Sequence, residues 1–272
     1  MKGHVWQQEE LAKLFLEGVR GAIPLAAVQM EVLLRIVRKT LPCVDRLLDL
    51  GCGDGILGRA VLAEYPQANG VFLDFSDPMI EVARQKALEQ GMRATFIVQD
   101  FGAKDWIQAV ADRAPFDLVV SGFAIHHQPD QRKRELYQEI FDLLKPGGMF
   151  LNQEHVSSKS KWAGQVFDEL FVDSLWSHHQ KQGGTKTREA IANEYYYRPD
   201  KEANILASVD VQCRWLEEIG FVDVDCFFKL FESVLFGGRR PASEASARQG
   251  RGTLPQAIEQ EDPPSRTRCH VR

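Results

Sequence analysis

Short apolar runs alternate with amphipathic stretches through the middle of this chain. Runs with the length and composition of buried strands lie at residues 46–50, 70–74, 95–99, 116–121 and 149–154. Between them, apolar residues recur at helical spacing at residues 56–65, 78–90, 104–111 and 131–144. Strands of this kind, separated by helices, are typical of a parallel sheet that is buried on both faces. The pattern therefore predicts a doubly wound α/β fold.

Two segments outside this alternation are also predicted to be helical. In residues 1–44, apolar positions recur at helical spacing between residues 5 and 40, which indicates two helices that end before Pro42. After residue 156 the alternation stops. Residues 157–203 hold one amphipathic stretch followed by a polar, glycine-containing stretch. We interpret this segment as a helical cap that is inserted over one end of the sheet.

The α/β pattern resumes in residues 204–238, which we assign to the same domain as residues 45–156. A helix is expected near residues 208–219, with Gly220 at its C-terminal end. Two strand-like runs follow at residues 221–228 and 230–236, so close together that we expect antiparallel neighbours. Residues 239–272 are rich in Pro, Ser and Arg and poor in large apolar residues, which predicts a disordered tail.

The composition narrows the class of protein. The 272 residues carry a net charge of −5, which argues against a nucleic-acid partner because phosphate binding needs concentrated basic charge. No apolar run approaches the roughly 20 residues that cross a bilayer, and the N-terminus lacks the basic-then-apolar order of a signal peptide. We therefore expect a cytoplasmic protein with no membrane partner. The five cysteines are scattered without a C-x-x-C pair, which disfavours a metal site or a disulfide framework.

A glycine-rich turn follows the first predicted strand. The sequence LDLGCGDG, residues 48–55, leads directly into a helix, and its glycines allow a tight turn and the close approach of a ligand. Its G-x-G-x-G spacing departs from the G-x-G-x-x-G of dinucleotide sites. Asp49 and Asp54 would also repel a pyrophosphate, by about 1–4 kcal/mol per pair of charges at surface-like dielectric constants. A cationic ligand without phosphate, such as S-adenosylmethionine, suits this turn better.

Two more acidic residues end neighbouring predicted strands. Asp74 follows the glycines by about twenty residues, where a carboxylate can accept hydrogen bonds from both hydroxyls of a ribose. Asp100 ends the third strand and, with the backbone of Phe101, could bind the amino edge of an adenine. Phe75, Met79 and Phe101 could flank the ring. Because ligands of open α/β sheets bind at the carboxyl ends of the strands, we expect these residues at one site.

The segments LDLGCGDG, FLDFS, VQDF, FDLVVSGFAIHH and LLKPGG resemble, in this order, the motifs of class I S-adenosylmethionine-dependent methyltransferases. The resemblance covers residues 46–154, and residues 215–238 look like the closing helix and strand pair of that family. It implies a Rossmann-like sheet of seven strands, mostly parallel, with an antiparallel last strand. It also implies that S-adenosyl-L-methionine is the cofactor.

The resemblance also assigns roles to residues by their place in these motifs. The methionine side of the cofactor would lie on the turn, the ribose on the second strand end, the adenine on the third, and the methyl group near the fourth. Asp49, Gly51, Gly53 and Gly55 would face the methionine side, and Cys52 lies in the same turn. Asp74 would hold the ribose, and Asp100 and Phe101 the adenine. Ser121, Gly122 and Phe123 would lie near the methyl group.

Candidates for acceptor chemistry follow the fourth and fifth predicted strands. A general base helps methyl transfer only when the acceptor is protonated at the working pH. His126 and His127 stand where the acceptor side of the site should begin, although either could instead pack against or cap the following turn. Glu154 and His155, at the end of the fifth strand, are further candidates.

The predicted cap offers side chains for substrate binding. Its aromatic residues could form a wall that excludes water or holds a cation, although packing within the cap is the simpler interpretation. They are Trp162, Tyr195, Tyr196 and Tyr197. Arg198 is the conspicuous candidate for an anion pocket. His178 and His179 are adjacent in a polar stretch, and no third residue is spaced to complete a metal site with them.

These residues leave the methyl acceptor open. The leading hypothesis is an enzyme that transfers a methyl group by in-line displacement to an O, N or C nucleophile of a small molecule. Ser-Gly-Phe-Ala follows the fourth strand in place of the N/D-P-P-Y/F signature that class I enzymes use on amide or adenine amino nitrogens. Alternatives on the same fold are remodelling of the cofactor methyl into a carboxymethyl group, a nucleic-acid methyltransferase, and a non-catalytic binding or regulatory protein.

Overall fold

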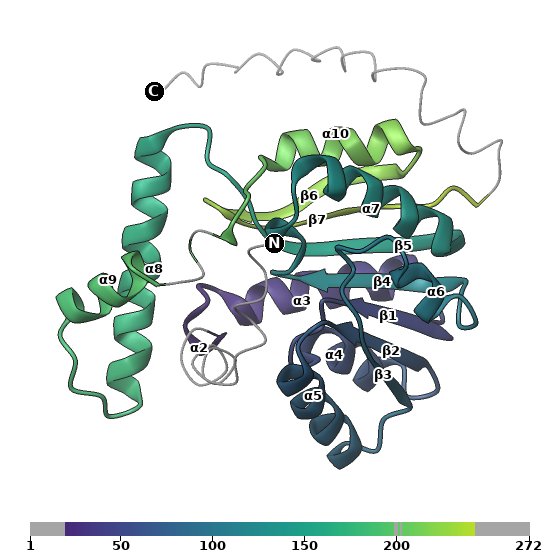
Figure 1. The fold of residues 1–272 in the computed structure, drawn as a ribbon, viewed down its shortest axis with the longest axis horizontal. Coiled ribbons are helices and arrows are strands. Elements are labelled where there is room, and N and C mark those ends of the chain that lie inside the picture. The colour runs from purple at the N-terminus through teal and green to yellow at the C-terminus, as the bar shows by residue number, and fades with distance from the viewer. Residues whose placement is uncertain (1–19, 199–200, 202, 243–272) are drawn as a thin grey trace, which may run out of the picture.

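The computed structural model describes residues 20–198, 201 and 203–242 (Figure 1). At its centre is a seven-stranded sheet in the order β3-β2-β1-β4-β5-β7-β6. The strands are β1 (Arg46–Leu50), β2 (Asn69–Asp74), β3 (Ala94–Val98), β4 (Phe116–Gly122), β5 (Leu144–His155), β6 (Val222–Leu230) and β7 (Ser233–Arg239). All pairings are parallel except those of β7, which runs antiparallel to β5 and β6. The doubly wound sheet with an antiparallel last strand is therefore confirmed.

Helices lie on both faces of this sheet, and a further pair stands beside one end of it (Figure 1). The helices are α2 (Arg20–Ala22), α3 (Ala26–Thr40), α4 (Ile56–Glu64), α5 (Asp77–Glu89), α6 (Trp106–Val110), α7 (Asp130–Leu143), α8 (Lys161–Lys181), α9 (Arg188–Tyr196) and α10 (Val209–Ile219), with a short 3-10 turn, η3, at Ile125–His127. The first of the two expected N-terminal helices falls mainly on residues outside the described part of the chain.

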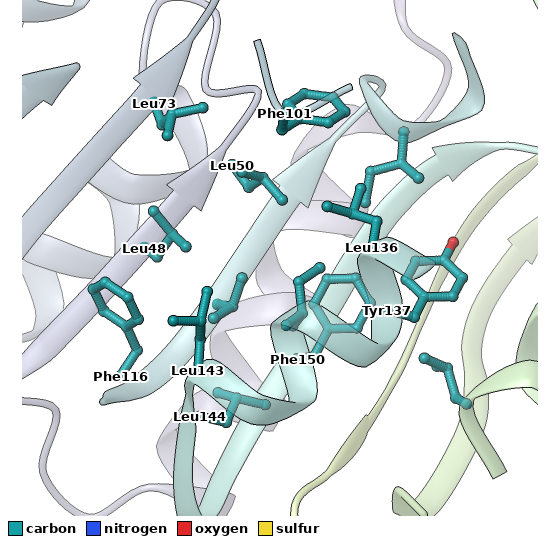
Figure 2. Close-up of a cluster of buried hydrophobic side chains, with 14 of the residues drawn as sticks. Leu48, Leu50, Leu73, Phe101, Phe116, Leu136, Tyr137, Leu143, Leu144 and Phe150 are labelled. Atoms are coloured by element: carbon teal, nitrogen blue, oxygen red, sulfur yellow. The ribbon is translucent and has the colours of Figure 1, made fainter. Parts of the chain in front are cut away.

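Two hydrophobic cores flank the sheet because successive residues of each strand face opposite sides. Leu48 and Leu50 of β1 belong to the core under α6, α7 and α10, whereas Leu47 belongs to the core under α3, α4 and α5. Figure 2 shows the first of these cores, in which Leu50, Phe101 and Tyr137 come from separate elements. Each fully buried leucine stabilises this arrangement by about 2 kcal/mol relative to an exposed one.

The last strand extends slightly further than the sequence indicates. β7 runs to Arg239, and the Arg240 guanidinium donates hydrogen bonds to the carbonyl oxygens of Phe141, Asp142 and Leu144 at 3.1, 3.2 and 2.6 Å. These carbonyls end α7, so Arg240 satisfies acceptors that the helix leaves open. The folded domain thus reaches two residues past the expected boundary at 238. Residues 243–272, which hold most of the predicted tail, lie outside the described residues.

The inserted segment forms the helices α8 and α9, which we name the arm (residues 161–196). Figure 1 shows the arm beside the end of the sheet, outside the two helical layers. It is attached to the N-terminal region, where the Ser174 hydroxyl donates to the carbonyl oxygen of Ala22 at 2.6 Å. None of the helices in the described part of the chain is both long and apolar enough to cross a membrane.

Gly237→Ala is expected to lower the free energy of unfolding by about 2–3 kcal/mol. A Cβ at Gly237 would lie 2.0 Å from the backbone oxygen of Phe150 in β5, so β5 and β7 would have to separate. Gly183→Ala is the control, because its φ of 79° strains alanine but no atom lies within 4 Å of the added Cβ. It should cost about 1 kcal/mol. Urea denaturation measures both, and equal losses would contradict the packing argument.

Candidate functional site

The turn between β1 and α4 has a conformation that only glycine adopts easily. Gly51, Gly53 and Gly55 have φ values of 67°, 53° and 76°, in the left-handed region that costs other residues roughly 1–2 kcal/mol each. A Cβ at Gly51 would also lie 2.4 Å from the Cβ of Ala124. The backbone of Gly51 therefore packs too closely against Ala124 for any larger residue to fit there.

Two buried carboxylates hold this turn in shape. The Asp49 carboxylate accepts the backbone N–H of Gly58 at 2.8 Å. Asp74 accepts the backbone N–H groups of Gly53 and Ser76 at 2.8 and 2.9 Å. Burial raises the pKa of Asp74, while hydrogen bonds from the backbone act in the opposite direction. Asp74 thus links the end of β2 to the glycine turn.

The charge of Asp54 is balanced by neighbouring cations. Its carboxylate lies 2.7 Å from the Lys86 Nζ and 3.9 Å from an Arg59 guanidinium nitrogen. Asp54 would therefore repel a pyrophosphate less strongly than the sequence alone predicts. Burial is the main cause that raises the pKa of the Cys52 thiol well above its usual value, and the charges of Asp74, Asp49 and Asp54 raise it further. Cys52 is therefore a neutral, buried packing residue.

The third strand end combines an exposed acid with a buried ring. Asp100 is exposed and accepts the backbone N–H of Gly102 at 2.7 Å. Phe101 is buried, and a Cβ at Gly51 would lie 3.1 Å from its ring. On α7, Arg132 donates to the carbonyl oxygens of Phe101 and Gly102 at 2.7 and 3.1 Å. The sequence analysis missed this contact, since nothing in the spacing of Arg132 indicates it.

The other residues expected around the cofactor lie along the same edge. Met79 is buried in the first turn of α5, and Phe75 is half-buried between β2 and α5. Ser121 is fully buried, and its hydroxyl donates to the carbonyl oxygen of Leu50 at 2.7 Å, so it joins β4 to β1. Gly122 ends β4 and is followed by Phe123, which has a φ of 51° although it is not a glycine. Strained backbone of this kind often marks a functional site.

Beyond β4, imidazole and carboxylate groups gather at the ends of β4 and β5. The Nδ1 of His126 lies 2.5 Å from the Oε1 of Glu154. Glu154 also accepts the backbone N–H groups of His126 and His155 at 3.1 and 2.8 Å. The His127 and His155 rings lie 4.0 and 5.8 Å from the His126 ring, centroid to centroid. The structure therefore brings together all four residues that the sequence nominates for acceptor chemistry.

Burial acts oppositely on the two members of the His126–Glu154 pair. It raises the pKa of Glu154 to about 7, although the backbone N–H of His155 and nearby positive charges act against this rise. It lowers the pKa of His126 well below its usual value, and the charges of His155 and Lys133 lower it further. Near neutral pH the pair therefore holds a neutral imidazole beside a carboxyl group that titrates.

A second carboxylate holds His155. The Nε2 of His155 lies 3.0 Å from the Oε2 of Glu232, and the Oε1 of Glu232 accepts the backbone N–H of Ser158 at 3.0 Å. Glu232 stands between β6 and β7, and its hydrogen bonds to His155 and Ser158 lower its pKa against the effect of burial. No local sequence signal points to Glu232, because only the fold of the β6–β7 turn brings it to β5.

The aromatic residues of the cap do not form one wall. Trp162 and Tyr197 are 72% and 84% exposed, whereas Tyr195 is buried. The Tyr195 hydroxyl donates to Asp168 at 2.6 Å, and its ring centre lies 4.4 Å from the Arg198 guanidinium carbon and 5.0 Å from the Lys201 Nζ. Tyr196 is partly exposed and lies near the same Lys201. The ring of Tyr195 is thus occupied by cations of the chain itself.

The paired histidines of the arm separate from each other. The His178 ring packs on Gly21, whereas His179 accepts the backbone N–H of Lys186 at 3.1 Å. Within residues 20–198, 201 and 203–242, no three His, Cys, Asp or Glu side chains gather as ligands for a metal.

Comparisons with known proteins agree with this geometry. A family model described as a methyltransferase domain matches residues 47–148. The chain is 23% identical over 225 residues to a carboxy-S-adenosyl-L-methionine synthase of Nautilia profundicola, covering 81% of this chain and 88% of that protein. It is 36% identical over 105 residues to a ubiquinone biosynthesis O-methyltransferase of Vibrio cholerae, covering 38% of this chain and 39% of that protein.

The fold agrees as well. An O-methyltransferase family protein from Burkholderia thailandensis matches with a TM-score of 0.59 at 18% identity, covering 86% of this chain and 59% of that chain. The topology, the motifs and these similarities lead to one conclusion. Residues 47–148 of this chain match a methyltransferase domain, and the sheet around them has the fold of S-adenosylmethionine-dependent methyltransferases.

Proposed function

We propose that this enzyme moves the methyl group of S-adenosylmethionine to a protonated oxygen of a small molecule, with His126 as the general base. The observation that carries the proposal is the 2.5 Å contact between His126 Nδ1 and Glu154 at the carboxyl ends of β4 and β5. An acceptor that is already ionised, such as a carboxylate, needs no base. A neutral imidazole held by a carboxylate therefore favours a hydroxyl acceptor, such as a phenol.

The cofactor site proposed from the motifs fits the geometry of the strand ends. Gly51 packs against Ala124 and Phe101, which brings the glycine turn next to the ends of β3 and β4. Asp74 would hold the ribose hydroxyls, while Asp100 and Phe101 would bind the adenine and Asp49 would face the methionine side. When bound there, S-adenosylmethionine supplies an electrophilic methyl group with a neutral thioether as leaving group. The carboxylates of Asp49, Asp54 and Asp74 near the Cys52 thiol support a cationic ligand.

The tautomer of His126 would then decide whether the site is active. When Glu154 is protonated, it donates to Nδ1, so the neutral imidazole carries its hydrogen on Nε2 and cannot accept another proton there. When Glu154 is ionised, Nδ1–H donates to the carboxylate and the lone pair of Nε2 is available to the acceptor. Glu154 is thus a positioning residue that controls the base through its own titration.

A second candidate function is remodelling of the cofactor into a carboxymethyl carrier. The Nautilia profundicola relative is named as a carboxy-S-adenosyl-L-methionine synthase. Arg198, nominated for an anion pocket, lies near enough to His126 for its charge to lower the pKa of the imidazole. Its guanidinium also donates to the carbonyl oxygen of Tyr195 at 3.1 Å. Mass spectrometry of the nucleoside products distinguishes the two functions, since only remodelling adds a carboxylate to S-adenosylmethionine itself.

A small-molecule acceptor also agrees with the net charge of −5, which gives little support to a nucleic-acid substrate. The cytoplasmic location expected from the sequence stays a prediction. An unbiased test of the acceptor incubates the protein with methyl-labelled S-adenosylmethionine and a metabolite extract. Label in a compound with a hydroxyl group supports the proposal, whereas label only in carboxylate esters or amines contradicts it.

Asp74→Asn is expected to weaken the binding of S-adenosylhomocysteine by about 10–100-fold, because the ribose hydroxyls lose a charge-assisted acceptor. Isothermal titration calorimetry measures the loss. Asp77→Asn removes the same charge from an exposed position in α5 and should leave affinity unchanged. Thermal denaturation separates this effect from a weakened turn, since Asp74 also accepts the N–H of Gly53. Unchanged affinity in Asp74→Asn would contradict the ribose assignment.

His126→Gln is expected to lower the turnover of the acceptor found in the screen by about 100-fold or more. Cofactor affinity should not change, because His126 lies on the acceptor side. His127→Gln is the matched control, since its ring lies 4.0 Å away and its Nδ1 contacts the carbonyl oxygen of Ala203 instead of a carboxylate. We expect a loss of less than about tenfold there. Equal losses in both variants, or none in His126→Gln, would refute the base assignment.

The turnover number of the wild-type enzyme is expected to rise with pH through a midpoint near 7, where Glu154 ionises. The rate rises with pH because a protonated Glu154 keeps the hydrogen of His126 on Nε2. Glu154 loses its proton as the pH rises, and the Nε2 lone pair then becomes able to accept a proton. Glu154→Gln cannot titrate, so it should remove this rise and leave a low, flat rate. Initial rates between pH 5.5 and 8.5 provide the measurement. A rate that falls across this range would contradict the mechanism.

A further inference from the structure

Lys133 is a fully buried lysine in the first turns of α7. Lysine is almost never buried to this extent unless it is paired, and a cation near a helix N-terminus faces the positive end of the helix dipole. Its Nζ donates to the Asp130 carboxylate at 2.8 Å and to the backbone carbonyl oxygen of Ile205. This placement is unfavourable for α7 alone, so it requires a reason outside the helix.

Ile205 belongs to residues 203–207, which we name the strap. The strap crosses the turn that carries His126. The backbone N–H of Ile205 donates to the carbonyl oxygen of His126 at 2.9 Å. The Nδ1 of His127 lies 3.3 Å from the carbonyl oxygen of Ala203. At the far end, Ala207 accepts the Ser157 backbone N–H and the Gln212 side-chain amide at 3.2 and 3.1 Å. Lys133 therefore holds the middle of the strap to α7, at the residue whose N–H bonds to the turn that carries His126.

Lys133 also places a positive charge beside the His126–Glu154 pair. Its charge lowers the pKa of both members, which means that it favours ionised Glu154 and neutral His126. This is the combination that leaves the Nε2 of His126 able to accept a proton. The other titratable or charged groups that face the pair are His127 from η3, His155 from β5, Tyr137 from α7 and Arg198 after α9.

We propose that Lys133 is a positioning residue of the acceptor site, which fixes the strap next to the His126 turn and places a buried positive charge beside that turn. The proposal rests on the proposed function, since it assumes that the His126–Glu154 pair is the reactive pair. It assigns one side chain two effects, mechanical and electrostatic. Substitutions that keep either the charge or a hydrogen-bond donor can therefore separate them.

The test follows the His126 imidazole directly, without an acceptor. Full-length protein labelled with ¹⁵N-histidine and saturated with S-adenosylhomocysteine is titrated between pH 5.5 and 9, and the ¹⁵N shifts report which ring nitrogen carries the hydrogen. His126→Gln identifies the His126 signals. Lys133→Met removes charge and donor, Lys133→Gln keeps a donor, and Lys133→Arg keeps the charge. Arg134→Met is the matched control, because Arg134 is the next cation along α7 and pairs on the surface with Glu218.

The tautomer change of His126 is expected near pH 7 in the wild-type protein and at a higher pH in Lys133→Met and Lys133→Gln, because both variants lose the positive charge. Lys133→Arg and Arg134→Met should keep the wild-type midpoint. Unchanged midpoints in both neutral variants would overturn the electrostatic role. If Lys133→Met does not fold, Lys133→Gln decides this point alone.

Hydrogen exchange at the Ile205 amide tests the strap. Exchange should be at least about tenfold faster in Lys133→Met than in Arg134→Met, because local opening of the strap loses a charged hydrogen bond. Equal rates would overturn the mechanical role. The two proposals can fail separately: turnover that survives in His126→Gln refutes the base, whereas wild-type titration and exchange in the Lys133 variants refute the positioning role.

Discussion

The parallel pairing of β1, β4 and β5 is the constraint on which the rest of the site depends. Leu50 pairs with Ser121, and Ser121 pairs with Asn152, so the three strands reach their carboxyl ends side by side. The hydroxyl of Ser121 reinforces this register through its bond to the carbonyl oxygen of Leu50. A shift of one residue would turn each side chain to the opposite face. The register therefore fixes how the glycine turn after β1 stands relative to the groups after β4 and β5.

The acceptor side concentrates buried charge that the fold alone does not need. Glu154 and Lys133 are both fully buried, and each must lose its hydration when the chain folds. Their hydrogen bonds offset part of this cost, and the contacts of Glu154 with backbone N–H groups hold its carboxylate in one orientation. A low local dielectric also strengthens the effect of each charge on the next. Burial of these charges destabilises the fold, but it also makes the protonation of the His126–Glu154 pair sensitive to neighbouring charges.

Sequence patterns predict the parts of this molecule that depend on local order. The glycines and Asp74 could be placed because strand ends of a parallel sheet meet at one edge, and β1 begins and ends where the apolar run predicts. The partner of Asp54 could not be placed, because Lys86 lies 32 residues away and reaches it from α5. Glu154 meets His126 over 28 residues because of the register between β4 and β5, which cannot be predicted from the sequence. Glu232 reaches His155 over 77 residues, through a turn with no recognisable signal.

The match to the methyltransferase domain model ends at residue 148, and this limit divides the site. His126 lies inside the matched segment, whereas Glu154, Glu232, the arm and the strap lie beyond it. The proposed base therefore lies within the matched segment, whereas the groups that contact it from β5 and from the strap lie outside that segment. Because Lys133 lies inside the matched segment and bonds to the strap outside it, it joins the two parts.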